Sequence, residues 1–152
     1  MLFSSPTFLF YFLPLTLLLA WITRRNRVVL LICSLIFYAW GEPTYVFLLV
    51  FVIIFNYYVG EAIQKYVELS KLLFLIGVIT DITILAIFKY ADFLIENLNG
   101  VLREFAFEAL PIPNIPLPLG ISFFTFQAVA YLIDIYMGRI SPSHSLLRFA
   151  VF

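Results

Sequence analysis

Five apolar stretches, separated by short polar or proline-containing segments, run along the chain. They cover residues 6–22, 28–40, 44–60, 72–88 and 119–137. Apolar runs of this length without strict alternation predict helices in an apolar medium. Each is somewhat shorter than the ~20 residues that cross ~30 Å of hydrocarbon, so helix ends, flanking aromatics and local bilayer thinning would complete each crossing. The pattern therefore predicts five short membrane helices.

The second stretch is the shortest, and two topologies compete for it. A single helix over residues 28–58 would place Glu42 and Pro43 near its middle, where a carboxylate costs about 2.5 kcal/mol or more. Aromatic residues typical of the headgroup region bracket the same point: Tyr38, Trp40 and Tyr45. We therefore expect a tight helical hairpin that turns at residues 41–43.

The pattern changes twice between the fourth and fifth stretches. Over residues 89–109, apolar side chains recur at helical spacing opposite polar ones, which predicts an amphipathic helix. Its expected apolar face is Phe93, Leu94, Leu98, Val101, Leu102, Phe105 and Ala109, and its polar face is Asp92, Glu96, Asn99, Arg103 and Glu104. Four prolines in "PIPNIPLP", residues 111–118, then favour a stiff extended connector. We expect an external amphipathic arm at the outer membrane interface or on the neighbouring helices.

Composition identifies the medium. Of the 152 residues, 64% are hydrophobic and 12% charged, and the mean hydropathy is +1.07. A soluble domain is about half apolar and about a quarter charged, and a soluble fold of this size could not bury so much apolar surface. We therefore predict an all-α, polytopic transmembrane helix bundle, in which residues 1–152 form part of one membrane domain.

The charges predict an orientation. The net charge is zero, and no basic patch points to a nucleic-acid partner. If the loop after the first stretch is cytoplasmic, six basic residues face the cytoplasm, while Lys89 and Arg103 face out. The six are Arg24, Arg25, Arg27, Lys65, Lys71 and Arg139. The positive-inside rule thus places the N-terminus outside.

Candidate chemistry is sparse. Cys33 is the only cysteine and lies in an apolar run, so we expect it to pack rather than to bind metal or form a disulfide. His144 is the only histidine and lies in the polar turn "SPSHS", where we expect no catalysis. No glycine-rich phosphate loop or metal-ligand spacing is present in the sequence. We predict no catalytic residue, no metal site and no bound cofactor in this chain.

The fifth stretch carries polar residues inside an apolar helix. Gly120, Gln127 and Asp134 recur every seven residues, as do Phe124 and Tyr131, and seven residues turn an α-helix by about 700°. Each set therefore forms a line that must face protein or water, because unsatisfied polar groups are costly in lipid. Two interpretations stay open: hydrogen bonding to neighbouring helices, or lining a cavity for a polar substrate.

Two further polar residues lie in other stretches. Asp81 lies midway along the fourth, between Thr80 and Thr83, and we expect a buried carboxyl group, either neutral or hydrogen-bonded. Asn56 near Gly60 predicts close helix packing through small and hydrogen-bonding residues. The candidate funnel-lining or interhelical polar residues are Gln127, Tyr131, Asp134, Asp81 and Asn56.

Several segments together resemble the membrane-bound O-acyltransferase family, in particular its branch of alginate and peptidoglycan O-acetylation proteins. They are "MLFSSPTFLFYFLPL", "LLICSLIFYAWGEPTYVFLLV", "NYYVG", "FKYADFLIENLN" and "PLGISFFTFQAVAYLIDIYMGRI". The stretch over residues 118–134 is the most specific part. The resemblance covers essentially the whole chain and implies the N-terminal part of a longer membrane protein in the bacterial inner membrane.

The resemblance also implies a chemistry. Helices in this family surround a funnel through which an acyl group passes from a cytoplasmic donor, here acetyl-CoA, to an exported polysaccharide, alginate-like or cell-wall glycan. An extracytoplasmic acetyltransferase-like partner is implied as well. The family's catalytic histidine lies in its C-terminal half, and no position of this chain matches it, His144 included. The chain stops within the apolar segment "LLRFAVF", so we expect a fragment that is inactive alone.

Two other functions remain compatible with the sequence. One is a small non-enzymatic membrane subunit that scaffolds a polysaccharide export assembly. The other is a transporter fragment in which Asp81, Gln127 and Asp134 line a polar path.

Overall fold

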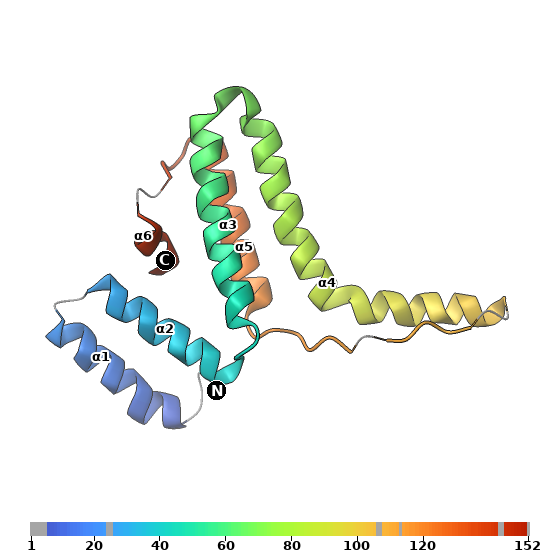
Figure 1. Ribbon diagram of the computed structural model, residues 1–152, viewed down its shortest axis with the longest axis horizontal. Coiled ribbons are helices and arrows are strands. Elements are labelled where there is room, and N and C mark those ends of the chain that lie inside the picture. Colours follow the sequence, from blue (N-terminus) through green and yellow to red (C-terminus); the bar gives the residue numbers. More distant parts are fainter. Residues whose placement is uncertain (1–5, 24–25, 106–107, 113, 143–144, 152) are drawn as a thin grey trace.

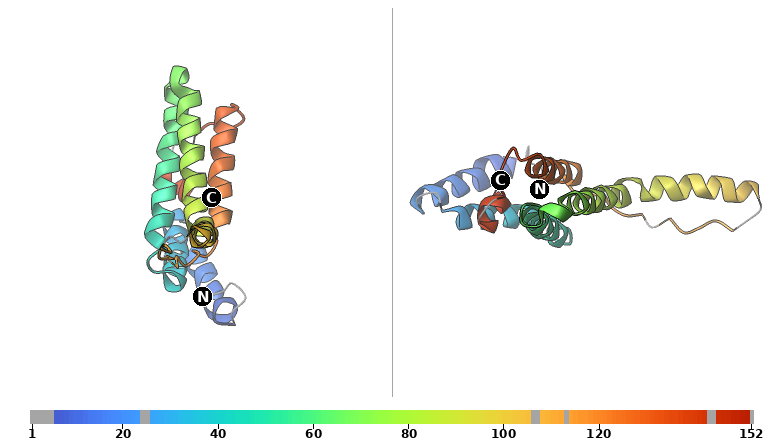
Figure 2. Two further views of the ribbon diagram at one scale, coloured as in Figure 1. Left: turned by 90° about the vertical axis from the view of Figure 1, so that its right-hand side faces the viewer. Right: turned by 90° about the horizontal axis from the view of Figure 1, so that it is seen from above.

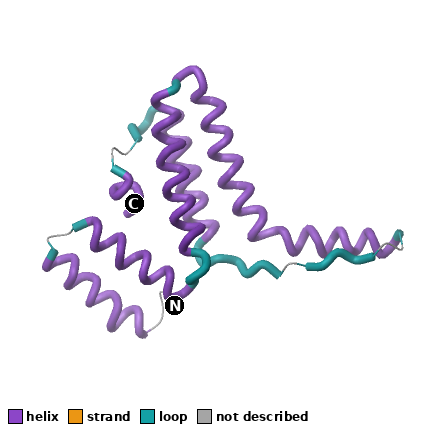
Figure 3. The backbone as a smooth tube through the Cα atoms, viewed as in Figure 1, coloured by secondary structure: helices purple, strands orange, loops and turns teal. Residues whose placement is uncertain are grey.

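The computed structural model describes residues 6–23, 26–105, 108–112, 114–142 and 145–151. The described residues form helices and loops, with no strand among them (Figure 3). In chain order the elements are the π-helix η1 (Phe8–Phe12), α1 (Leu13–Ile22), α2 (Arg27–Gly41), α3 (Val46–Lys65), the 3-10 helix η2 (Val67–Leu69), α4 (Ser70–Glu104), α5 (Ile121–Tyr136) and α6 (Leu146–Val151). The predicted all-α class is confirmed.

The core is a three-helix unit made of α3, the first half of α4 and α5, which lie side by side (Figures 1 and 2). Helix α5 contacts both of the others along its length. Its buried positions are spaced alternately by four and three residues, as in helices that pack along one seam. They include Ile121, Thr125, Ala128, Leu132 and Ile135.

Two glycines allow α5 to approach its neighbours closely. A Cβ atom on Gly60 of α3 would lie 2.9 Å from the ring and hydroxyl of Tyr131 and 2.9 Å from Ile135 Cδ1. A Cβ atom on Gly77 of α4 would lie 2.5 Å from Leu132 Cδ1. Leu132 is fully buried at this crossing. Small residues at such crossings are typical of helices that pack in a membrane, where dispersion contacts rather than exclusion from water drive association.

The predicted bundle of five spans is not confirmed. Among the described residues, two helices are long and apolar enough to cross a membrane, Val46–Lys65 and Val67–Arg103, whereas α1, α2 and α5 are shorter. The third helix continues five residues beyond the predicted residue 60, because nothing after Gly60 breaks it until Tyr66. Many large apolar side chains face outward, Trp21, Phe47 and Phe123 by more than 70%. Such exposure, together with the two long helices, indicates a membrane protein.

Helix α4 differs from expectation because the fourth stretch and the amphipathic arm form one continuous helix of 35 residues. No proline lies between residues 70 and 104, so the helix has no reason to stop at residue 88. At about 1.5 Å per residue it is about 52 Å long, well over the ~30 Å of hydrocarbon. It bends, and its second half extends sideways from the unit (Figure 1). The arm ends at Glu104 rather than at residue 109.

The turn after α2 lies where the sequence predicted it, but the hairpin is not tight. Helix α2 ends at Gly41, and the amide of Glu42 donates to the carbonyl of Tyr38 at 2.8 Å. Helix α2 then diverges from α3 (Figure 1) and contacts α1 and α6 more extensively. The rings of Phe8 and Phe12 pack on Phe37, with centroids 4.8 and 5.2 Å away, so aromatic contacts hold α2 to the N-terminal helix instead.

The basic residues follow the topology of the unit. Lys65 and Lys71 flank the turn between α3 and α4, and Arg139 follows α5 at the same end, since α3 and α5 run together and α4 runs against them (Figure 1). Arg24 and Arg25 lie outside the described residues. The N-terminus-out orientation stays a prediction.

The close approach at Gly60 generates a test of the packing. Gly60→Ala is expected to lower the free energy of unfolding by roughly 1–3 kcal/mol, because the new methyl group meets the rigid ring of Tyr131. The matched control is Gly100→Ala in α4, where a Cβ atom meets nothing within 4 Å. The control is expected to gain up to about 1 kcal/mol from helix propensity. Unfolding of the detergent-solubilised chain measures both, and equal effects would contradict the packing.

Candidate functional site

A buried polar pair joins α3 to the first half of α4. The side-chain amide of Asn56 donates to Asp81 Oδ1 and to the carbonyl of Val52, both at 3.0 Å. Asn56 is 0% exposed and Asp81 1% exposed, so water cannot substitute for these bonds. Because removing an interhelical partner leaves a buried polar group unpaired, the pair fixes the register of α3 on α4. The sequence predicted a buried carboxyl group at Asp81, neutral or hydrogen-bonded, and close helix packing at Asn56, but not that the two side chains would meet.

Two oxygen atoms of the pair lack a hydrogen-bond donor among the described residues. Asn56 Oδ1 and Asp81 Oδ2 are both buried, and neither has a hydrogen-bond partner among the described residues. These oxygens belong to the same two side-chain groups that share the 3.0 Å bond. Both oxygens lack a donor, and a neutral carboxyl group or an amide at position 81 would bring one into the pair.

A cavity of about 120 Å³ lies where α3, α5 and α6 meet. Its walls are mainly apolar, and Gln127 and Tyr131 are the described lining residues that carry a polar group. The lining residues are Leu49, Val52, Ile53, Phe124, Gln127, Ala128, Tyr131, Phe149 and Ala150. The ring of Tyr131 packs against that of Phe149 with centroids 4.4 Å apart, so α6 forms one wall of the cavity.

The polar pair and the cavity lie on neighbouring turns of α3. Val52 lines the cavity, and its carbonyl also accepts the hydrogen bond from Asn56. One turn after Asn56, Gly60 lies against Tyr131. The structure therefore gathers four of the five predicted polar residues in the middle of the unit, some as an interhelical bond and some as a cavity wall.

Asp134 is not part of this group. It lies near the end of α5 with its side chain 39% exposed, and its Oδ1 is 3.4 Å from the Arg139 guanidinium, a weak partly solvated ion pair. Its backbone carbonyl accepts from the Arg139 amide at 2.8 Å and so helps to end the helix. The seven-residue spacing from Gln127 is real, but two turns carry Asp134 beyond the cavity. His144 lies outside the described residues.

Two residues that matter for packing were not identified from the sequence. Thr125 is 1% exposed on α5, and the alternating spacing of buried residues could have placed it there. Asn99, expected on the polar face of the arm, is 6% exposed and bonds to both backbone groups of Leu110. No local pattern marks that contact, because it depends on the path of the connector.

The cavity lining suits ligand binding. Among the described residues of its walls, the polar side chains are those of Gln127 and Tyr131, and no histidine, serine, cysteine or carboxylate is among them. Among the described residues, no three histidine, cysteine, aspartate or glutamate side chains lie close enough to hold a metal ion. These groups can orient a polar ligand by hydrogen bonding in apolar surroundings.

The two oxygen atoms without a donor suggest a test at Asp81. Asp81→Asn is expected to retain the stability of the chain within about 1 kcal/mol, because an amide can donate to Asn56 Oδ1. Asp81→Leu is expected to lose roughly 1–3 kcal/mol, since it leaves the Asn56 amide buried with one partner fewer. Unfolding of both variants in the same detergent measures the difference. Equal losses would show that the carboxylate itself is needed.

Comparisons with known proteins agree with this architecture. The chain is 38% identical over its full length to the probable alginate O-acetylase AlgI of Pseudomonas aeruginosa and 37% identical to that of Azotobacter vinelandii. It is 41% identical over 90% of its length to the peptidoglycan O-acetyltransferase of Helicobacter pylori. The chain spans 30%, 32% and 27% of the length of these relatives.

No family model matches the chain, and no solved structure matches it. The similarity to curated relatives nonetheless runs through α1 to α6, including the three-helix unit and the cavity. The resemblance predicted from the sequence motifs is confirmed: the chain is related, over 90–100% of its length, to probable alginate O-acetylases and to a peptidoglycan O-acetyltransferase.

Proposed function

We propose that the chain is the N-terminal portion of a membrane-bound O-acyltransferase that passes an acetyl group across the bacterial inner membrane to an exported polysaccharide. The observation that carries this proposal is the 37–41% identity, over 90–100% of the chain, to alginate and peptidoglycan O-acetylases. The acceptor is an alginate-like polymer or a cell-wall glycan, as in those relatives. Both polymers are rich in hydroxyl groups, so one reaction, the transfer of an acyl group to a hydroxyl, suits either of them.

Within such an enzyme, this portion is a scaffold and one wall of the acyl path. The three-helix unit is rigid where Asn56 binds Asp81 and where Leu132 fills the crossing at Gly77. Beside it, Gln127 lines an apolar cavity together with the ring of Tyr131, whose hydroxyl lies buried against Gly60. An acetyl group in transit needs such surroundings: apolar contacts for its methyl group and a donor for its carbonyl oxygen.

The bond-making chemistry lies elsewhere in the proposed enzyme. Removing a proton from an attacking hydroxyl needs a base that titrates near neutral pH, and histidine is the side chain best suited to this. We assign that role to a histidine outside this chain, acetyl-CoA to the donor side, and an acetyltransferase-like protein to the extracytoplasmic side. In this arrangement Lys65, Lys71 and Arg139 mark the cytoplasmic end of the unit, and the N-terminus lies outside.

A segment exchange tests the proposal. In the alginate O-acetylase of Pseudomonas aeruginosa, the matching part is replaced by this chain, and the O-acetyl content of secreted alginate is measured by proton NMR. The chimera is expected to restore acetylation to a strain that lacks the enzyme. Gln127→Leu in the chimera is expected to lower acetylation by about tenfold, the value of one hydrogen bond to the substrate.

Two controls make the result decisive. The same exchange with the Azotobacter vinelandii sequence shows whether the enzyme tolerates an exchanged segment from another probable alginate O-acetylase. Glu96→Gln, an exposed change on the arm, is expected to leave acetylation unchanged. If the Azotobacter exchange works and this chain, present in the membrane at the same level, gives no acetylation, the proposed function is wrong.

A further inference from the structure

The second half of α4, residues 89–104 and hereafter the arm, extends sideways from one end of the three-helix unit (Figures 1 and 2). The start of the arm is held in contact with the residue that precedes α3. The ring of Tyr45 meets Phe88 edge-on at 5.6 Å, and the Tyr45 hydroxyl donates to the Pro116 carbonyl at 3.0 Å. If α3 and the first half of α4 cross the bilayer, the arm must run along the bilayer surface where they emerge.

Large apolar side chains form a continuous stripe along the arm. They recur at intervals of four, four, three and four residues, which keeps them on one side of a helix. Each is exposed by 46% to 69%. The stripe consists of Tyr90, Leu94, Leu98, Val101 and Phe105.

The opposite side of the arm is polar. Glu96 and Arg103 are exposed and lie roughly 160° around the helix from the centre of the stripe, at 100° per residue. The ammonium group of Lys89 lies 5.5 Å from the centroid of the Tyr90 ring, where the stripe begins. A tyrosine with a snorkelling lysine at the point where a helix leaves the hydrocarbon is typical of the headgroup region.

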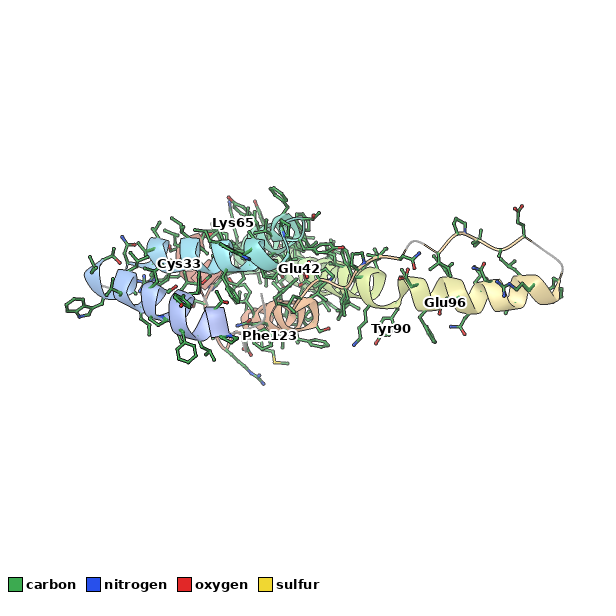
Figure 4. The ribbon with its side chains drawn as sticks, turned by 90° about the horizontal axis from the view of Figure 1, so that it is seen from below. Cys33, Glu42, Lys65, Tyr90, Glu96 and Phe123 are labelled. Atoms are coloured by element: carbon green, nitrogen blue, oxygen red, sulfur yellow. The ribbon has the colours of Figure 1, made fainter. Side chains whose placement is uncertain are left out.

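The connector runs along the polar side of the arm and leaves the stripe open. Asn99 Nδ2 donates to the Leu110 carbonyl at 2.8 Å, and the Leu110 amide donates to Asn99 Oδ1 at 2.7 Å. At 100° per residue, Asn99 lies about 140° around the helix from the centre of the stripe. The two hydrogen bonds to Leu110 therefore hold the returning chain away from the stripe. Figure 4 shows the connector returning along one side of the arm and Tyr90 on the other.

We propose that the arm is an interfacial membrane helix whose stripe is embedded in the headgroup and acyl boundary of a phospholipid bilayer. The contact between Tyr45 and Phe88 sets the depth of the arm in the bilayer. The stripe supplies the face buried in lipid, and Glu96 and Arg103 stay in water. Residues 89–104 carry two basic and three acidic side chains, so anionic lipid is not needed for the contact. This proposal is independent of the acyltransferase function.

Nitroxide labels on single cysteines test the proposal in the full chain reconstituted in phosphatidylcholine vesicles. Cys33, the only cysteine, is first replaced by alanine. Labels are placed on the stripe by Leu94→Cys, Leu98→Cys and Val101→Cys, and on the polar side by Glu96→Cys and Arg103→Cys. Collision rates with oxygen, which concentrates in lipid, and with a water-soluble nickel complex are measured, and circular dichroism checks the helix content of each variant.

The ratio of oxygen to nickel collisions is expected to be several-fold higher at the three stripe positions than at the two polar positions. Adding phosphatidylglycerol is expected to leave this difference unchanged. Equal ratios on both sides would place the arm in water and overturn the proposal. Low collision rates with both reagents at the stripe would show that protein covers it, either a second copy or another part of a longer chain, and would overturn it equally. The three stripe positions keep the test open if one variant does not fold.

Discussion

A hydrogen bond between two fully buried polar side chains, Asn56 of α3 and Asp81 of α4, is the constraint on which the rest of the structure depends. In apolar surroundings neither group has water as an alternative partner, so sliding one helix along the other leaves both groups buried without this bond. The bond thus fixes which turns of α3 and α4 face each other. That register places Gly60 and Gly77 where α5 can approach both helices.

The cavity and the remaining helices are arranged around the three-helix unit. Helix α5 brings Gln127 and Tyr131 beside the turn of α3 that carries Asn56, and α6 encloses the cavity through Phe149. By contrast, α1 and α2 hold to each other through phenylalanine rings, and the arm touches mainly its own connector. A rigid centre with separate attachments suits the proposed role as a scaffold beside an acyl path.

Apolar runs predicted the helical class, a carboxylate and a proline between two such runs predicted the turn near Glu42, and polar residues inside the runs marked the candidates, four of which the structure gathers. The pattern did not predict where α4 ends, because an amphipathic helix can continue a membrane helix without any change in local propensity. Asp134 shares the seven-residue spacing of Gln127, yet helix length, not spacing, carries it out of the unit. Partner choice, as in Asn56 with Asp81 or Asn99 with Leu110, depends on register between segments distant in sequence.

A double-mutant cycle on Asn56→Ala and Asp81→Ala, with unfolding measured for the chain in one detergent or bilayer, tests the central bond most directly. The account predicts that the two changes together cost less than the sum of the single changes, with a coupling of about 0.6 kcal/mol or more, the typical size of an interhelical hydrogen bond in membrane proteins. Additive losses would mean that Asn56 and Asp81 act independently, and the register of the three-helix unit would then need another explanation.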